Sequence, residues 1–182
     1  MQPNSKLKLY TDGSCRTNPG GVGGWGVVIR TSDHNEDIIS IMSGGEPNTT
    51  NSRMELMGVI KGLEVVHLYR LSDMVTVYSD SKYVIDNCTK FTNYPSDEAD
   101  LWERYFSLND VFKDISHVWI PGHTGHPLQE IADTLATNAS GDLKAWLEKT
   151  NQNRKRKFNF TRGKTSSTKQ DSKPRLKEIL SE

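Results

Sequence analysis

The sequence predicts an α/β fold in which a mixed sheet carries helices on its faces. Three strand-like segments come first, at residues 6–12, 25–30 and 38–42, with no helical spacing between them. One or two helical segments then separate each later strand from the next, up to about residue 140. Hairpins join antiparallel strands and helical crossovers join parallel ones, so this order of elements is typical of a mixed sheet.

The strands are recognised by alternation or by β-branched and aromatic runs. Residues 6–12 alternate between polar and apolar side chains, and residues 75–79 are a β-branched and aromatic run. A last strand is predicted at 115–120. Residues 13–26 hold six of the 14 glycines and one proline, which predicts a tight turn region, and residues 44–51 are predicted to form a loop.

The helices are recognised by apolar spacing and by residues typical of helix ends. Ser52 is predicted to cap a helix, with Glu55 three residues later as its capping-box partner, and this helix should end near 71–73. Pro127 stands where a helix begins, and Gly141 should end that helix. Further helices are predicted at 81–88, 99–112 and 142–149.

The distribution of charge predicts two domains. Residues 1–150 carry 13 Lys and Arg against 20 Asp and Glu, a net charge of −7, and residues 151–182 carry 10 against 3, a net of +7, which sum to zero. We therefore predict a globular domain at 1–149 and a basic tail at 150–182. The tail has too few apolar side chains to offset the entropy of ordering, so we expect it to be disordered when free.

Cysteine usage and hydropathy exclude several classes of protein. The two cysteines, Cys15 and Cys88, provide neither a zinc-ligand spacing nor a disulfide framework, so we expect reduced thiols and a cytoplasmic protein. No stretch approaches the ~18 consecutive apolar residues of a transmembrane helix. The polar segment 1–8 does not have the pattern of a signal peptide. We expect a monomer without membrane contact.

Four acidic residues occupy positions at which sites form in α/β proteins. Asp12 and Asp80 end predicted strands at the carboxyl edge of the sheet, and Glu55 and Asp133 can reach that edge from the first turns of helices. Any one of them alone is more simply explained as a solvated or capping carboxylate. Together they would repel one another unless cations lay among them, and oxygen-only ligation suits Mg²⁺ or Mn²⁺ rather than Zn²⁺.

Five motifs stand in a distinctive order: Thr11-Asp12-Gly13-Ser14, Asn18-Pro19-Gly20, Asn51-Ser52-Arg53-Met54-Glu55-Leu56, Ser79-Asp80-Ser81, and Gly122-His123-Thr124-Gly125-His126-Pro127 with Ala132-Asp133. Over about residues 6–139, the chain thereby resembles the bacterial-type (type 1) ribonuclease H family. The resemblance implies a ribonuclease H-like fold with a five-stranded mixed sheet and helices on both faces. It also implies an endonuclease that cuts the RNA strand of RNA–DNA hybrids, leaves 5′-phosphate and 3′-hydroxyl ends, and removes RNA primers or R-loops during replication.

The resemblance assigns catalytic roles to five residues. Asp12, Glu55, Asp80 and Asp133 match the family's metal-binding carboxylates, which implies two Mg²⁺ ions that Mn²⁺ can replace. Two such ions ~3.5–4 Å apart can hold the attacking water and the leaving oxygen of a phosphate displacement. His123 matches a loop histidine that assists proton transfer or product release. His126, outside this set, is assigned to bracing the loop.

The resemblance also implies contacts with the hybrid. Asn18, Thr50 and Asn51 match a pocket for a phosphate of the DNA strand, although Asn-Pro-Gly is also a turn sequence in its own right. Contacts with the RNA backbone are implied for Ser14, Cys15 and Lys82. Gln129 stands where the family usually has an asparagine, and it offers a longer amide with similar hydrogen bonding.

One departure from the family concerns affinity for the hybrid. Many bacterial members carry a basic, tryptophan-rich protrusion, and residues 87–99 are too short and too acidic to form one. The tail interleaves cations with aromatic residues, so we expect it to supply hybrid affinity instead. A solubilising linker is the alternative. The residues concerned are Arg154, Lys155, Arg156 and Lys157, and the apolar Leu176, Ile179 and Leu180 could dock on a replication protein.

Two other functions remain open from the sequence. One is a related nuclease of the same fold, such as a resolvase or a DNA-strand nuclease, against which the histidine loop and the Arg53-Met54-Glu55-Leu56 motif argue. The other is a hybrid-binding module without catalysis, which a missing carboxylate would have indicated. All four carboxylates are present.

Overall fold

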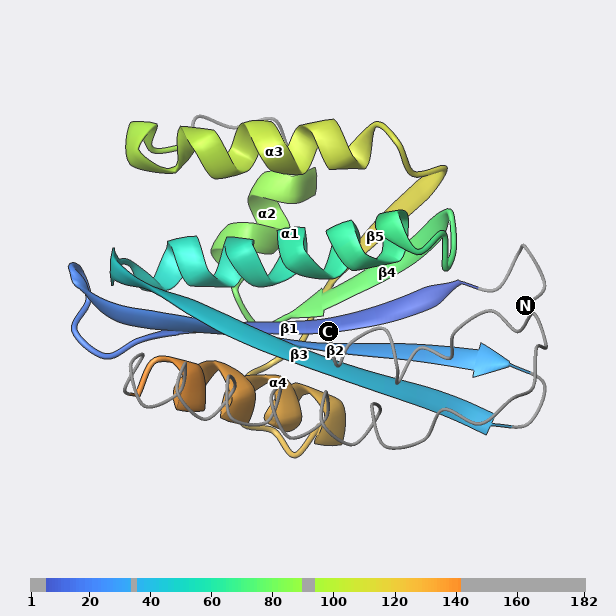
Figure 1. Cartoon of the computed structure of the whole chain (residues 1–182), viewed down its shortest axis with the longest axis horizontal. Coiled ribbons are helices and arrows are strands. Elements are labelled where there is room, and N and C mark those ends of the chain that lie inside the picture. Colours follow the sequence, from blue (N-terminus) through green and yellow to red (C-terminus); the bar gives the residue numbers. More distant parts are fainter. Residues whose placement is uncertain (1–5, 34–35, 90–93, 142–182) are drawn as a thin grey trace, which may run out of the picture.

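A computed structural model describes residues 6–33, 36–89 and 94–141, which form one five-stranded sheet with helices on both faces (Figure 1). The strands are β1 (Leu7–Cys15), β2 (Gly21–Asp33), β3 (Glu36–Thr49), β4 (Met74–Ser79) and β5 (Asp114–Trp119). Their order in the sheet is β3-β2-β1-β4-β5. The first three strands pair antiparallel, whereas β1, β4 and β5 pair parallel. The predicted mixed sheet is confirmed.

The turn predicted within residues 13–26 is confined to residues 16–20, and the loop predicted at 44–51 was wrong because most of it is strand. β2 begins at Gly21 and β3 continues to Thr49. The glycines serve close packing, because a Cβ on Gly24 or Gly26 would lie 2.3 Å or 2.2 Å from the carbonyl oxygens of helix residues. The absence of side chains at these two positions lets a helix rest directly on the sheet.

The helices lie in two unequal layers. One face carries α1 (Asn51–Leu68), α2 (Lys82–Thr89), the short 3-10 helix η1 (Ser96–Glu98) and α3 (Ala99–Asn109), and α4 (Pro127–Ala139) covers the other (Figure 1). The predicted helices therefore exist, apart from that at 142–149, which lies outside the described residues, as does the tail at 150–182. No helix in the described ranges is long and apolar enough to span a membrane.

The cap of α1 differs from the prediction. Thr50, not Ser52, is the N-cap residue, and its hydroxyl accepts a hydrogen bond from the Arg53 amide at 3.2 Å. Thr50 has extended backbone angles, as a cap requires. Glu55 lies one turn further along and is buried at 6% exposure, so it is available to a site instead of a capping box.

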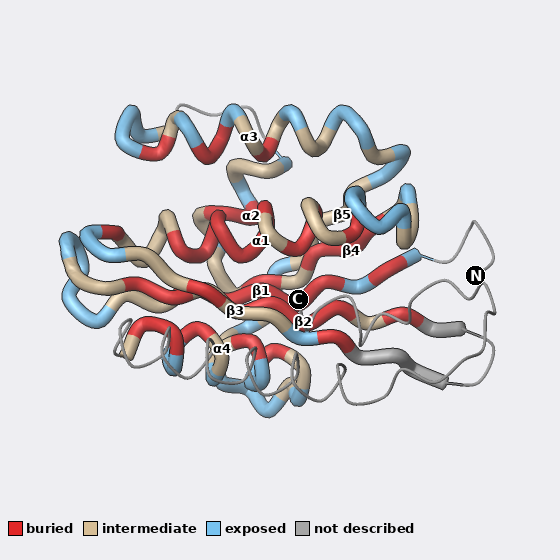
Figure 2. The backbone as a smooth tube through the Cα atoms, in the orientation of Figure 1, coloured by how far each residue is buried: buried red, intermediate tan, exposed pale blue. Residues whose placement is uncertain are grey.

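Each face of the sheet has its own core (Figure 2). The larger core joins the sheet to α1 and α3 through fully buried side chains such as Leu9, Ile60 and Trp102. The smaller core joins Tyr10 and Val28 to α4. Both layers are thus anchored to β1, so residues on opposite faces are held in fixed positions at the end of this strand.

Candidate active site

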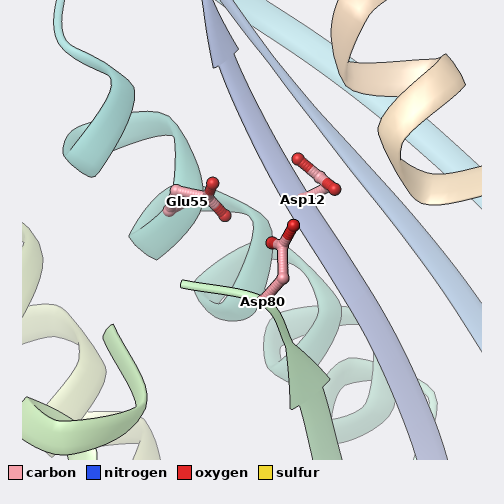
Figure 3. A group of neighbouring side chains, drawn as sticks. All are labelled: Asp12, Glu55 and Asp80. Carbon is pink, nitrogen blue, oxygen red and sulfur yellow. The ribbon is translucent and has the colours of Figure 1, made fainter. Parts of the chain in front are cut away.

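Three carboxylates meet where β4 ends and β1 continues. The parallel register pairs Tyr10 with Tyr78, so Asp12 and Asp80, two residues further along, reach the same level of the sheet. Glu55 joins them from α1, and one oxygen from each of the three residues lies within 4.8 Å of the others (Figure 3). The structure therefore brings together three acids that are 25 to 68 positions apart in the sequence.

Gly13 allows Glu55 to approach β1. A Cβ at position 13 would lie 2.2 Å from the Glu55 backbone nitrogen, so the first turn of α1 rests on bare main chain. The backbone of Gly13 also acts on the carboxylates of Asp12 and Glu55, and it lowers the pKa of each against the larger effect of burial. Asn51 lies one helical turn before Glu55, and its Nδ2 donates to Glu55 Oε1 at 3.5 Å.

The electrostatics of this group favour the neutral acids. Burial, together with the charges of Asp80 and Asp133, raises the pKa of Asp12 to about 7. Burial and the charges of Asp12 and Asp80 raise the pKa of Glu55 well above its ordinary value. Burial also raises the pKa of Asp80. Like charges confined in a partly desolvated site raise each other's pKa, and a cation placed among them would reverse the shifts.

Asp133 and His123 lie at the rim of the group. The side chain of Asp133 on α4 is 34% exposed, and its Oδ2 lies 3.7 Å from Nδ1 of His123. His123 is 81% exposed, in a loop where its φ is +52°. Both are close enough to Asp80 to affect its pKa: after burial, His123 lowers it and Asp133 raises it. The site is thus open to solvent on the α4 side.

Gln129 lies beneath the site and not at its surface. It is 3% exposed, and its Nε2 donates to the Asp12 side chain (Oδ2, 3.0 Å) and the Thr11 carbonyl (3.1 Å). This placement fixes one oxygen of Asp12, and a contact of Gln129 with substrate stays a prediction. His126 braces the same segment, since its Nδ1 accepts from the Gln129 amide at 3.4 Å and its ring packs on Tyr10.

The residues predicted to bind the DNA strand lie close together. The backbone N–H of Asn51 donates to Oδ1 of Asn18 at 3.1 Å and so links the β1–β2 turn to the start of α1. Thr50 is the adjacent cap residue. The cap, the turn and Asn51 therefore form one continuous polar surface beside Glu55.

The residues predicted to bind the RNA strand have intramolecular partners. The hydroxyl of Ser14 lies 3.2 Å from that of Ser140, and the thiol of Cys15 donates to the carbonyls of Thr17 and Thr49. Lys82 is exposed beside the site. Cys15 and Cys88 are both free thiols, as predicted. Arg154, Lys155, Arg156 and Lys157 lie outside the described residues.

Two residues that contact Asp80 were not predicted from the sequence. A Cβ on Gly122 would lie 2.3 Å from Oδ2 of Asp80, so the loop after β5 closes directly on this carboxylate. The indole of Trp119 donates to the Asp80 carbonyl at 2.9 Å. A signal was available for Trp119, because it ends the strand expected to lie beside the one that delivers Asp80.

Comparisons with known proteins agree with this geometry. The RNase H family model matches residues 4–141. Ribonuclease H of Novosphingobium aromaticivorans is 38% identical over 146 residues, which are 74% of this chain and 96% of that protein. Ribonuclease H of Erythrobacter litoralis is 40% identical over 147 residues, with the same two shares.

Solved structures show the same fold. RNase H1 from the halophilic archaeon Halobacterium salinarum matches with a TM-score of 0.63 and 25% identity, over 74% of this chain and 96% of that one. LC11-RNase H1, solved in complex with an RNA/DNA hybrid, matches with a TM-score of 0.60 and 25% identity, over 74% and 99%. Because the family model spans nearly all of the described residues and the relatives are matched over almost their whole length, the chain belongs to the ribonuclease H family.

Proposed function

We propose that this protein hydrolyses the RNA strand of RNA–DNA hybrids in its interior and leaves 5′-phosphate and 3′-hydroxyl ends. The observation that carries the proposal is the convergence of one oxygen each from Asp12, Glu55 and Asp80 within 4.8 Å, where β4 ends beside β1. LC11-RNase H1, which has the same fold, was solved in complex with an RNA/DNA hybrid, and this supports such a hybrid as the substrate. Removal of primers or R-loops during replication is the process that this activity would serve.

The donor set fits a hard divalent cation. Ribonucleases H depend on divalent metal ions, and all three converging ligands are carboxylates. Oε2 of Glu55 is buried without a hydrogen-bond partner among the described residues, so one strong acceptor in the group awaits a ligand. Mg²⁺ meets these requirements, and Mn²⁺ shares its preference for oxygen.

Asp12, Glu55, Asp80 and Asp133 would hold two Mg²⁺ ions. The bound metal supplies charge neutralisation at the phosphate and a water of lowered pKa. The three converging carboxylates come from different, well-packed segments, so they would be held in fixed positions around the scissile phosphate. Asp133 completes the set from α4, where its partial exposure leaves it on the solvent side of the site.

His123 is the group placed to move a proton. Its imidazole stands in solvent with Nδ1 directed at Asp133, in a loop that also contains Gly122 and Gly125. An imidazole near neutral pH can accept a proton and release it to water. We assign it to proton transfer at the rim or to the departure of the product, as its loop position allows.

The hybrid would lie across β1 and the first turns of α1 and α2. Asn18, Thr50 and Asn51 offer amide and hydroxyl groups to a DNA-strand phosphate, and such contacts position a duplex without reading its sequence. Ser14, Cys15 and Lys82 border the RNA strand, with Gln129 beneath it. Discrimination between RNA and DNA requires a contact to the 2′-hydroxyl, which is both donor and acceptor.

The basic tail at 150–182 would add affinity. The body at 1–150 carries a net charge of −7, which opposes binding of a polyanion, and Arg154, Lys155, Arg156 and Lys157 supply the missing cations. Truncation after Lys149 should raise the KM for the hybrid and flatten its dependence on salt. An unchanged KM and salt slope would show that the tail is a linker.

The deciding experiment is cleavage of a hybrid labelled on either strand, with Mg²⁺ and with EDTA, by the parent and by Asp80→Asn. Metal-dependent cleavage of the RNA strand alone, lost in the variant, is the expected result. If the parent bound the hybrid and left both strands intact with Mg²⁺ and with Mn²⁺, the chain would be a binding module. Cleavage of the DNA strand would indicate a related nuclease of the same fold.

A further inference from the structure

Trp119, the last residue of β5, lies beside the segment that carries Asp80. It pairs with Ser79, the last residue of β4, and Ile120 extends this pairing by donating to the Ser79 carbonyl at 3.0 Å. The Asp80 carbonyl lies one residue beyond the last strand pair. The indole N–H of Trp119 donates to this carbonyl at 2.9 Å, so a side chain holds the main chain where the sheet ends.

The same indole ring also contacts Lys82. This lysine is the first residue of α2 and is exposed, and its ammonium lies 4.6 Å from the centre of the Trp119 ring. Over the described residues, Lys82 forms no salt bridge with a carboxylate. A lysine side chain samples many rotamers in water, and an aromatic face beneath the ammonium restricts them.

Trp119 does not have the environment of a core residue. Its side chain is 41% exposed, whereas Trp102 in the main core is fully buried. Its indole N–H and its ring face make two polar contacts, with the Asp80 carbonyl and with Lys82, and both lie beside the active site. Tryptophan is the residue that offers an indole donor and a strong cation-binding face together.

We propose that Trp119 is a positioning residue with two separable effects. Its N–H fixes the main chain at Asp80 and thereby the metal-binding carboxylate. Its ring holds Lys82 extended at the rim, where the ammonium meets a phosphate of the RNA strand. The second effect rests on the proposed function, because it needs a polyanionic substrate, whereas the first concerns the protein and its metal alone.

Three variants separate these effects. Trp119→Phe keeps an aromatic face for Lys82 and removes the donor to Asp80. Trp119→Leu removes both. Lys82→Met keeps the length of the side chain and removes its charge, and the double variant Trp119→Leu/Lys82→Met closes a thermodynamic cycle. Far-UV circular dichroism and thermal unfolding establish that each variant is folded.

The contact itself is measured in the free protein. An indole ring shifts the NMR signals of protons above its face upfield, so the side-chain methylene signals of Lys82 should be shifted in the parent. The shift should persist in Trp119→Phe and vanish in Trp119→Leu. Calorimetric titration with MgCl₂ alone should show about fivefold weaker binding in Trp119→Phe, from the lost hydrogen bond, and parent-like binding in Lys82→Met.

The kinetics of hybrid cleavage then test the effect of the Trp119 ring on Lys82. Lys82→Met and Trp119→Leu should each raise the KM about two- to fivefold, because one loses the cation and the other its orientation. Only Lys82→Met, which removes the charge, should lower the salt slope by about one. In KM, the double variant should be no worse than Lys82→Met alone, because Trp119 acts through Lys82. Fully additive effects on KM, or unchanged Mg²⁺ binding in Trp119→Phe, would overturn the proposal.

Failure of the proposed function would look different. If the parent left the hybrid intact, the assignment as a ribonuclease would fall, whereas the Lys82 shifts and the MgCl₂ titrations would still decide whether Trp119 positions Lys82 and Asp80. If the parent cut the hybrid and Trp119→Leu matched it in KM, in Mg²⁺ affinity and in Lys82 shifts, the inference about Trp119 alone would fall.

Discussion

Two groups of acidic residues flank the first turn of α1, and they differ in whether a cation is paired with them and in the direction of their pKa shifts. On one side, Asp12, Glu55 and Asp80 face one another with no lysine or arginine ion-paired to them among the described residues, and their pKa values are raised. On the other side, Arg53 holds Asp100 through two hydrogen bonds, at 2.8 and 3.0 Å. This contact lowers the pKa of Asp100.

The two groups share one short segment of helix. Arg53 also lies 3.6 Å from Glu46 on β3, and Nη1 donates to the Asp97 carbonyl, so it ties α1 to β3 and to η1. Glu55, two residues later, points into the unpaired group. Within the described residues, a cation therefore lies beside the acids that support the fold, and no lysine or arginine is paired with the three site carboxylates.

The largest expected effect is the loss of one site carboxylate. Asp80→Asn should reduce cleavage by roughly three orders of magnitude, because it removes a metal ligand. In EDTA the variant should unfold at a higher temperature than the parent, since one repelling charge is gone.

The matched control is Asp100→Asn, which makes the same substitution in the paired group. It should leave cleavage unchanged and lower the free energy of unfolding by up to about 1 kcal/mol, the range of an exposed ion pair. If Asp80→Asn kept more than about a tenth of the activity, the claim that the unpaired carboxylates are needed for cleavage would be wrong.

The next effect concerns the packing that holds the unpaired group. Gly122→Ala places a methyl carbon 2.3 Å from Oδ2 of Asp80, which is too close, so the carboxylate must move. We expect kcat to fall about 10- to 100-fold while the protein stays folded, since small displacements of a catalytic group are costly. Steady-state kinetics and thermal unfolding test this, and an unchanged kcat would show that Asp80 tolerates displacement.

A smaller effect is expected from removing the cation of the paired group. Arg53→Met leaves Asp100 and Glu46 without their partner and should lower the free energy of unfolding by ~1–2 kcal/mol. Urea unfolding measures the loss. Arg53→Lys is the control, because it keeps the charge and cannot form the two-pronged contact with Asp100, so it should recover part of the stability. If the parent, Arg53→Met and Arg53→Lys were equally stable, the contact between Arg53 and Asp100 would not contribute to stability.

The last prediction concerns a difference in pH dependence. The folded, metal-free chain holds the Asp12 proton up to about pH 7, whereas an unfolded chain loses it near the ordinary value of 3.8. Between these values the folded state binds more protons, so the contribution of Asp12 to stability falls as the pH rises. Asp100, whose pKa is lowered, contributes stability that is lost as the pH falls below about 4.

Substitution separates the two contributions. In EDTA, Asp12→Asn should gain stability relative to the parent as the pH rises from about 4 to 7, as judged from urea midpoints. Asp100→Asn should differ from the parent by a constant amount over that range. A parent and Asp12→Asn that run parallel would show that Asp12 is not protonated in the folded chain.

The sequence predicted most of the architecture and the candidate carboxylates. Alternation at 6–12 and the β-branched run at 75–79 define β1 and β4, because a strand with a buried face requires such side chains. The five motifs led to the family, which the comparisons establish. The errors in the strand predictions arose at glycine, because its usual role in turns outweighed, in the prediction, its use where a helix rests on a strand.

Other features could not be predicted because they depend on contacts between distant segments. Nothing in the sequence near Gln129 indicates that its amide lies under Asp12, 117 positions away. Trp119 stands near the end of a predicted strand, but its contact with Lys82 was not predicted, because it depends on β4 and β5 ending at the same level. Capping by Thr50 rather than Ser52 was decided by where β3 ends, immediately before the helix.

The sequence by itself determined which elements form and which acids can take part, since periodicity, strand ends and motifs are local properties of the chain. The tertiary structure alone decided that Asp12, Glu55 and Asp80 meet with no lysine or arginine paired to them in the described part of the chain, while Asp100 meets Arg53. The physical reason is that a pKa shift depends on burial and on charges within a few ångströms, and both are set by the packing of α1 and β4 against β1.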